Sequence, residues 1–113
     1  MQNMIEKTIS EIEAKVRSTE AVNDAHKQDL LGLLGKLKAE IGALEQTHSE
    51  EAKTIAASVH ASTQEATSEN QNPESLQNSV AGLRSSVEGF EQSHPKLVQV
   101  VNSLSNMLSN LGI

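Results

Sequence analysis

Two histidines could do chemistry, because each follows a glutamate by three positions on what reads as the apolar face of a helix. The two motifs are Glu45-x-x-His48 and Glu91-x-x-His94. Residues three apart are neighbours on a helix surface, and helical bundles build di-iron and di-manganese sites from Glu-x-x-His motifs on two facing helices. The spacing therefore makes these four residues, His48, His94, Glu45 and Glu91, the candidate metal ligands.

A structural role for both histidines is the competing interpretation, and the sequence favours it. The di-iron pattern also needs carboxylates from two further helices, and few are available near these motifs. His94 would then be a cap or hydrogen-bond donor beside Pro95, and His48 a partly exposed residue of the helix face. His26 and His60 fall on polar faces, where we expect exposure to solvent. Under this interpretation no cofactor is expected.

Long amphipathic helices must position the histidines, and the last third of the chain shows the clearest one. Its apolar residues alternate in steps of four and three, which places them on one face of an α-helix but not of a strand. We expect this helix over residues 73–111, beginning with Asn72 as N-cap and Pro73 at the first position and stopping at Gly112. Its apolar face comprises Leu76, Val80, Leu83, Val87, Phe90, His94, Leu97, Val101, Leu104, Leu108 and Leu111.

Two further helices share this spacing. Residues 4–20 carry Ile5, Ile9, Ile12 and Val16, and residues 24–68 carry Leu30, Leu34, Leu37, Ile41, Leu44 and His48, followed by an alanine-rich half. Asn23 and Asp24 are good N-cap residues for the second helix. The segment 68–73 lacks periodicity and ends in Asn-Pro, which predicts a turn. The chain is therefore expected to be a single all-α domain of three helices.

Two positions could interrupt the long helices. Pro95 removes a backbone donor and crowds the preceding turn, so the third helix should either kink there or restart with Ser93 as its cap. The spacing of apolar residues keeps its phase through His94, which favours a kink in one continuous helix. Residues 47–50 have the form of a capping box, which could divide the second helix. Antiparallel pairing about the turn at 68–73 places His48 near His94. If both interruptions are real, they should lie side by side.

The expected architecture is an antiparallel, coiled-coil-like hairpin of two long helices, with the short first helix making a three-helix bundle at one end. That bundle would consist of residues 4–20, 24–46 and 95–111 and would hold the drier core. The other end would be a two-helix arm, 48–69 against 73–93. If continuous, the second helix would be roughly 65 Å long at about 1.5 Å per residue.

Composition excludes several kinds of partner and site. The net charge of −6 repels phosphate backbones and anionic lipids, so neither nucleic acid nor a membrane is an expected partner. The chain has no cysteine, which excludes disulfides and thiolate ligands. It shows neither a secretory signal pattern nor an apolar run of the roughly 20 residues that span a bilayer. We expect a cytoplasmic protein.

Sequence features of an enzyme are missing, since no glycine-rich phosphate loop follows a strand and no serine lies in a nucleophile elbow. A two-helix arm would leave alanines and serines exposed unless another copy covered them. We therefore expect a non-enzymatic oligomeric scaffold or protein-interaction module, first of all a dimer, in which residues 48–93 contribute to the contact. An unidentified protein partner is a further candidate. The alternative is a metal-binding bundle that uses His48 and His94 with nearby glutamates.

Two motifs near the C-terminus are specific enough to suggest a family. They are Phe90-Glu91-Gln92-Ser93-His94-Pro95 and the closing Leu111-Gly112-Ile113. With these motifs the chain resembles the small bacterial proteins grouped as domain of unknown function 4404, and the opening residues 4–9 are similar too. The Ala/Ser-rich centre around 49–72 looks like a spacer of variable length or an insertion. The resemblance implies no activity, substrate, cofactor or catalytic residue for this chain.

Overall fold

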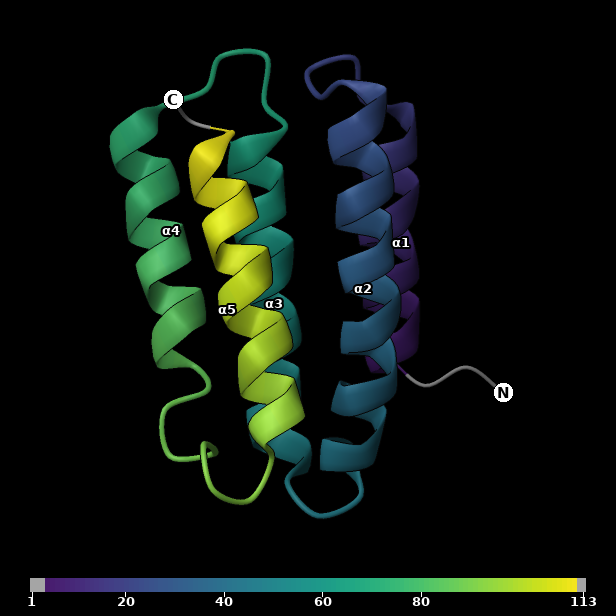
Figure 1. Cartoon of the computed structure of the whole chain (residues 1–113), viewed down its shortest axis with the longest axis vertical. Coiled ribbons are helices and arrows are strands. Elements are labelled where there is room, and N and C mark those ends of the chain that lie inside the picture. The colour runs from purple at the N-terminus through teal and green to yellow at the C-terminus, as the bar shows by residue number, and fades with distance from the viewer. Residues whose placement is uncertain (1–3, 112–113) are drawn as a thin grey trace.

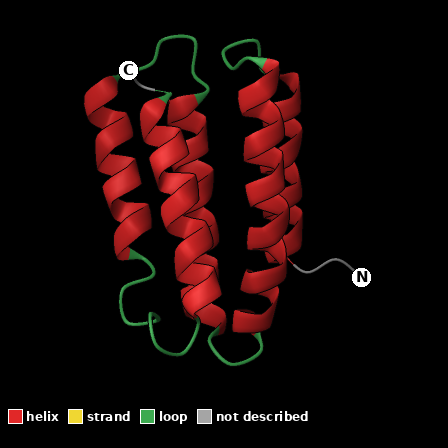
Figure 2. Cartoon of the chain, viewed as in Figure 1, coloured by secondary structure: helices red, strands yellow, loops and turns green. Residues whose placement is uncertain are grey.

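The computed structural model describes residues 4–111, and its regular structure is helical throughout (Figures 1 and 2). The five helices are α1 (Met4–Ser18), α2 (Asp24–Glu45), α3 (Ser49–Ala66), α4 (Pro73–Ser85) and α5 (Pro95–Asn110). No strand occurs within residues 4–111, so the expected all-α class is confirmed. The helix stop expected at Gly112 lies outside the described residues.

Capping side chains explain two of the helix starts. Asn23 precedes α2, and its side-chain oxygen accepts a hydrogen bond from the His26 backbone N–H at 2.9 Å. Asn72 precedes α4 and accepts from two backbone N–H groups of the first turn. Pro73 follows at the first helical position, where a missing N–H leaves no bond unmade. The cap at Asn72 and the turn before it are thus as predicted.

The helix expected over residues 24–68 is divided into α2 and α3, with residues 46–48 between them. The backbone N–H of His48 still donates to the Leu44 carbonyl at 2.8 Å, so α2 closes on a full helical turn. The chain then reverses direction. As a result α3 packs against α2 instead of extending it.

The helix expected over residues 73–111 is also divided, with residues 86–94 between α4 and α5. The expectation was a kink at Pro95 in one continuous rod, but the structure has a reversal that starts well before the proline. Gly89 lies in this segment with a φ of 95°, a left-handed conformation that glycine adopts at little cost and that regular helix does not allow.

These two reversals fold the expected hairpin over on itself. The helix pairs of the expected hairpin remain, since α2 packs against α5 and α3 packs against α4. The reversals add two further pairs, α2 with α3 and α4 with α5. The molecule measures 37 × 29 × 20 Å, so the extended two-helix arm is replaced by a short, thick bundle. The loops 46–48 and 86–94 lie together at the lower end of Figure 1, and the loops 19–23 and 67–72 lie at the upper end.

α1 packs against α2 and α3, which corrects the expected three-helix bundle of residues 4–20, 24–46 and 95–111. The third member is α3 rather than α5, because the reversal at 46–48 brings α3 alongside α2. In Figure 1, α1 lies behind α2 and α3 lies behind α5. Ala56 of α3, which is buried and lines a groove together with residues of α1, is small enough to let α1 approach closely.

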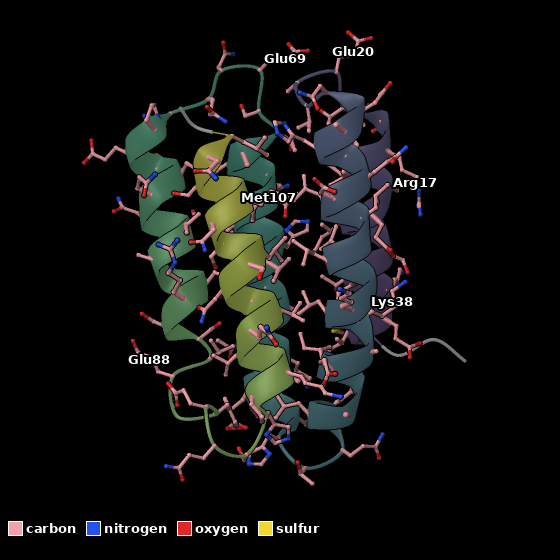
Figure 3. All side chains as sticks on the ribbon, in the orientation of Figure 1. Arg17, Glu20, Lys38, Glu69, Glu88 and Met107 are labelled. Carbon is pink, nitrogen blue, oxygen red and sulfur yellow. The ribbon has the colours of Figure 1, made fainter. Side chains whose placement is uncertain are left out.

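Polar side chains also attach α1 to its neighbours. The Lys38 ammonium of α2 donates to Glu13 Oε1 at 2.7 Å and to Ser10 Oγ at 3.3 Å, both on α1. Figure 3 shows Lys38 on the side of α2 that borders α1. In the loops that join the helices at the upper end, Thr19 Oγ1 donates to the Thr67 carbonyl at 3.4 Å.

One hydrophobic core runs through the whole bundle. Val59 and Leu83, which belong to the expected arm, are as completely buried as Leu37 and Leu104 at the expected three-helix end. The division into a dry end and an exposed arm is therefore corrected, because α1 and the folded hairpin cover the arm residues. Glu20, Glu69 and Glu88 extend outward from loops at the two ends (Figure 3). None of the described helices combines the length and the apolar character that crossing a bilayer requires.

Candidate functional site

The two histidines of the candidate metal site lie where the reversals meet. His48 is the residue before α3, and His94 is the residue before α5. Their ring centroids are 6.0 Å apart. The prediction that the two interruptions lie side by side is confirmed. The loops that carry the rings are the two lower loops of Figure 1.

The ring of His48 is oriented by the residue before it. Its Nδ1 lies 2.7 Å from the Thr47 hydroxyl oxygen, and that hydroxyl also donates to the Leu44 carbonyl at 3.4 Å. A hydroxyl has one proton to give. The contact with Nδ1 is the shorter of the two, and which atom donates in it depends on the tautomer of the ring.

His94 repeats this local structure. Its backbone angles are φ −137° and ψ 62°, against −135° and 64° for His48. Its backbone N–H donates to the Phe90 carbonyl at 2.8 Å, and its Nδ1 lies 3.0 Å from the Ser93 hydroxyl oxygen. His94 occupies the N-cap position, as the structural interpretation expected, but its side chain makes no capping hydrogen bond.

Phe90 joins the two imidazoles in a cluster of three rings. Its centroid lies 5.4 Å from that of His48 and 5.7 Å from that of His94, and all three pairs are edge-to-face. This arrangement directs the positive edge of one ring at the negative face of another. The half-buried Phe90 therefore contacts both histidine rings.

The two glutamates of the candidate site have different surroundings. Glu45 is half-buried, and its Oε2 is buried without a hydrogen-bond partner. Glu91 is exposed, and its Oε2 accepts from the Gly89 backbone N–H at 2.9 Å. Among residues 4–111, no three His, Asp or Glu side chains are grouped so as to hold a metal ion. The fold brings the histidines together but does not gather both glutamates around them.

The other two histidines lie elsewhere. His26 is exposed in the first turn of α2, as expected. His60 was expected to be exposed as well, but it is half-buried on α3 and borders a groove beside α1. Neither lies in the ring cluster of His48, Phe90 and His94.

That groove between α1 and α3 was missed by the sequence reading, because the two helices were not expected to be neighbours. It has a volume of about 350 Å³, and Met4 at its edge is 72% exposed. The lining residues are Met4, Ile5, Thr8, Glu11, Lys53, Ala56, Ala57 and His60. Both helices lie at the back of the view in Figure 1.

The matched histidines belong to an internal repeat, which the sequence reading also missed. Residues 30–48 align without a gap to residues 76–94, 46 positions later. The matched pairs are Leu30/Leu76, Leu34/Val80, Leu37/Leu83, Lys38/Arg84, Ile41/Val87, Leu44/Phe90, Glu45/Glu91, Gln46/Gln92, Thr47/Ser93 and His48/His94. The available signal was the sequence Glu-Gln-Thr/Ser-His occurring twice. In space, α2–α3 and α4–α5 are corresponding hairpins, and the first helix of each packs against the second helix of the other.

The two hairpins differ in what covers their outer grooves. α1 covers the first, where Lys38 reaches its side chains. In the second, Arg84 corresponds to Lys38 and donates instead to Asn106 Oδ1 of α5 at 2.7 Å. Gln77 donates to the Ser109 hydroxyl at 3.0 Å. Two polar residues of 73–86, Gln77 and Arg84, thus bridge α4 to α5, which gives this segment a source of stability within one chain.

Comparison with known proteins identifies the family. The family described as domain of unknown function (DUF4404) matches residues 30–113. The match begins at Leu30, where the repeat begins, and includes the centre around 49–72 that looked like a spacer. No curated protein and no solved structure matches the chain. Because the matched region is well over half of the sequence, the chain belongs to the DUF4404 family.

Proposed function

We propose that this chain is a non-enzymatic protein-interaction module that works as a homodimer through the groove between α1 and α3. The observation that carries the proposal is the groove itself, where Ala56 and Ala57 form an apolar floor beside the exposed Met4. Met4 is the large hydrophobic residue that residues 4–111 leave exposed. Exposed apolar surface that borders a groove is typical of a docking site.

The charges around the groove favour a second copy as the occupant. The chain as a whole carries −6, so two copies repel each other over most of their surfaces. Around the groove the signs are mixed, since its lining includes Glu11 on α1 and Lys53 on α3, and Lys15 lies further along α1. In a two-fold interface the same surface of both copies meets, so a residue of one copy contacts a different residue of that surface on the other copy. Glu11 of one copy can therefore pair with Lys53 of the other.

This proposal keeps the expected oligomer but moves its contact. The sequence placed the contact on an arm of residues 48–93, and half of that segment, α4, uses its apolar face against α3 and α5. The other half, α3, borders the groove with Lys53 and Ala57. A groove lined by two helices also suits an amphipathic helix of another protein, and such a partner would compete with the second copy.

Light scattering on matched variants tests the proposal. At high micromolar concentration we expect twice the chain mass of 12.1 kDa. Ala57→Glu places a charge in the groove and should return the mass to that of one chain. Ala81→Glu is the control, because Ala81 is an exposed alanine of α4 away from the groove. A wild-type mass of one chain, or equal effects of both variants, would refute the proposed interface.

A further inference from the structure

We propose that a small cavity between α1 and α3 binds a free α-amino acid with a small side chain, in its zwitterionic form. The cavity has a volume of about 150 Å³. Its lining residues are Glu11, Ile12 and Lys15 of α1 and His60, Thr63 and Gln64 of α3. It adjoins the groove of the proposed dimer, with which it shares Glu11 and His60. The proposal goes beyond the dimer and does not rest on it, because two helices of one chain line the cavity.

The first step of the argument is the hydroxyl of Thr63. This residue is 2% exposed, and its Oγ1 is buried without a hydrogen-bond partner. Other threonines of the bundle satisfy their hydroxyls locally, since Thr8, Thr54 and Thr67 each donate to the carbonyl four residues earlier. The Thr63 hydroxyl does not turn back to its own helix in this way. A buried hydroxyl without a partner carries the cost of its lost hydration, so a polar ligand in the cavity that Thr63 lines would stabilise it.

The second step is a pair of opposite charges on α1. Glu11 and Lys15 are four residues apart, a spacing at which this order of charges favours an ion pair. Both line the cavity, yet among residues 4–111 neither side-chain charge has an ion-pair partner. An α-amino acid offers an ammonium to Glu11 and a carboxylate to Lys15, and both bonds would be charge-assisted. A simple anion would leave Glu11 unpaired and a simple cation would leave Lys15 unpaired, so the charges favour a zwitterion.

The third step is size. Pockets for drug-sized ligands measure roughly 300–1,000 Å³, so a cavity of about 150 Å³ limits the ligand to a few non-hydrogen atoms. Among the α-amino acids, this size suits glycine, alanine and serine. The buried Ile12 provides an apolar wall, which favours the methyl group of alanine. His60 and Gln64 add hydrogen-bonding groups on the α3 side of the cavity.

Calorimetric titration of L-alanine into the full chain tests the proposal. We expect one L-alanine to bind per chain with a Kd of about 1 mM or lower. Acetate and methylammonium each carry only one of the two charges. Each should bind at least about tenfold more weakly, since it leaves one charged side chain of α1 without a partner. A higher Kd for L-alanine, or a smaller preference over either ion, would overturn the proposal.

Variants of two threonines separate a binding role from a structural one. Thr63→Val removes the buried hydroxyl, so L-alanine binding should weaken at least about fivefold. The melting temperature should stay the same or rise, because the hydroxyl without a partner is gone. Thr54→Val, on the exposed face of α3, is the matched control and should leave binding unchanged. Equal binding by wild type and Thr63→Val would show that this cavity is not the site.

Lys15→Gln distinguishes the cavity from the dimer interface. Lys15 lines the cavity but not the groove. The variant should therefore weaken L-alanine binding at least about tenfold, while light scattering finds the same mass as for wild type. L-alanine binding that is unchanged in Lys15→Gln contradicts the proposed charge pairing. A wild-type mass of one chain would refute the dimer and leave this test unaffected.

Amide spectra of the wild-type protein locate the site without any variant. On addition of L-alanine we expect the backbone signals of residues 11–15 and 60–64 to shift together, with one Kd. Shifts confined to other parts of the chain would place the ligand elsewhere and overturn the proposal.

Discussion

His48 and His94 have the same backbone conformation within 2° in φ and ψ, each at the reversal of one helical hairpin. Each donates its backbone N–H at 2.8 Å to the carbonyl four residues earlier, and each has a hydroxyl residue before it. The residues that follow differ, Ser49 in the first hairpin and Pro95 in the second. The backbone conformation of these two reversals is therefore compatible with either serine or proline at the next position.

Ser49→Pro should be tolerated. Pro95 already occupies the first helical position after the same backbone angles, and proline there restricts the unfolded chain without breaking a helical hydrogen bond. We expect stabilisation of about 0.4–1 kcal/mol in urea melts. Thr54→Pro, in the interior of α3, is the control and should cost about 3 kcal/mol or more. A loss at position 49 comparable to that at 54 would mean that the two reversals are not equivalent.

Replacing a glycine by alanine should change the stability of the protein in opposite directions in the two hairpins. Gly89 has a φ of 95°, and an L-residue in that conformation is strained, so Gly89→Ala should destabilise by about 1–2 kcal/mol. Gly35 lies in α2 with open space around the added methyl. There Gly35→Ala should stabilise by about 0.5–1 kcal/mol. Thermal unfolding of both variants measures the difference, and two changes of the same sign would contradict the left-handed turn.

Leu37→Ala and Leu83→Ala should destabilise the protein by similar amounts. The two leucines are matched in the repeat and both are fully buried, so each truncation should cost about 2–5 kcal/mol. Gln99→Ala, on the exposed face of α5, should change stability by less than about 0.5 kcal/mol. Denaturant melts that find Leu83→Ala much milder than Leu37→Ala would instead support an exposed arm around Leu83.

Removing two buried hydroxyls should stabilise the bundle. Ser62 and Ser105 are fully buried, and neither hydroxyl has a hydrogen-bond partner. Ser62→Ala and Ser105→Ala should each raise the free energy of unfolding by about 1 kcal/mol, because each removes a hydroxyl that lost its hydrogen bonds to water on folding and gained no partner. Ser103→Ala, exposed on α5, measures the helix-propensity gain alone, roughly 0.5 kcal/mol. If the buried variants gain no more than Ser103→Ala, each hydroxyl has a partner in solution.

Local chemistry made much of the fold predictable. The four-three spacing of apolar residues identified the buried faces, because a helix places such residues on one side whatever it packs against. Asn72 before Pro73 identified a helix start, since the cap and the proline act on adjacent backbone groups. Antiparallel pairing about the turn at 68–73 placed His48 beside His94, and the 6.0 Å between their rings agrees.

The direction of the chain after each interruption depended on tertiary packing. A break at residues 46–48 is compatible with a kinked rod and with a full reversal, because a capping-box pattern marks an interruption without fixing the direction of the helix that follows. Packing selects the reversal, since it lets α3 contact α1, α2 and α4 and leaves Ala52 and Val59 fully buried. The same choice created the groove beside Ala57 and the ring cluster around Phe90. The sequence by itself determined which helix faces are apolar and where the helices can begin. The tertiary structure decided which of these faces pack together, because the burial of a residue depends on its neighbours in space, and the spacing of residues within one helix does not specify those neighbours.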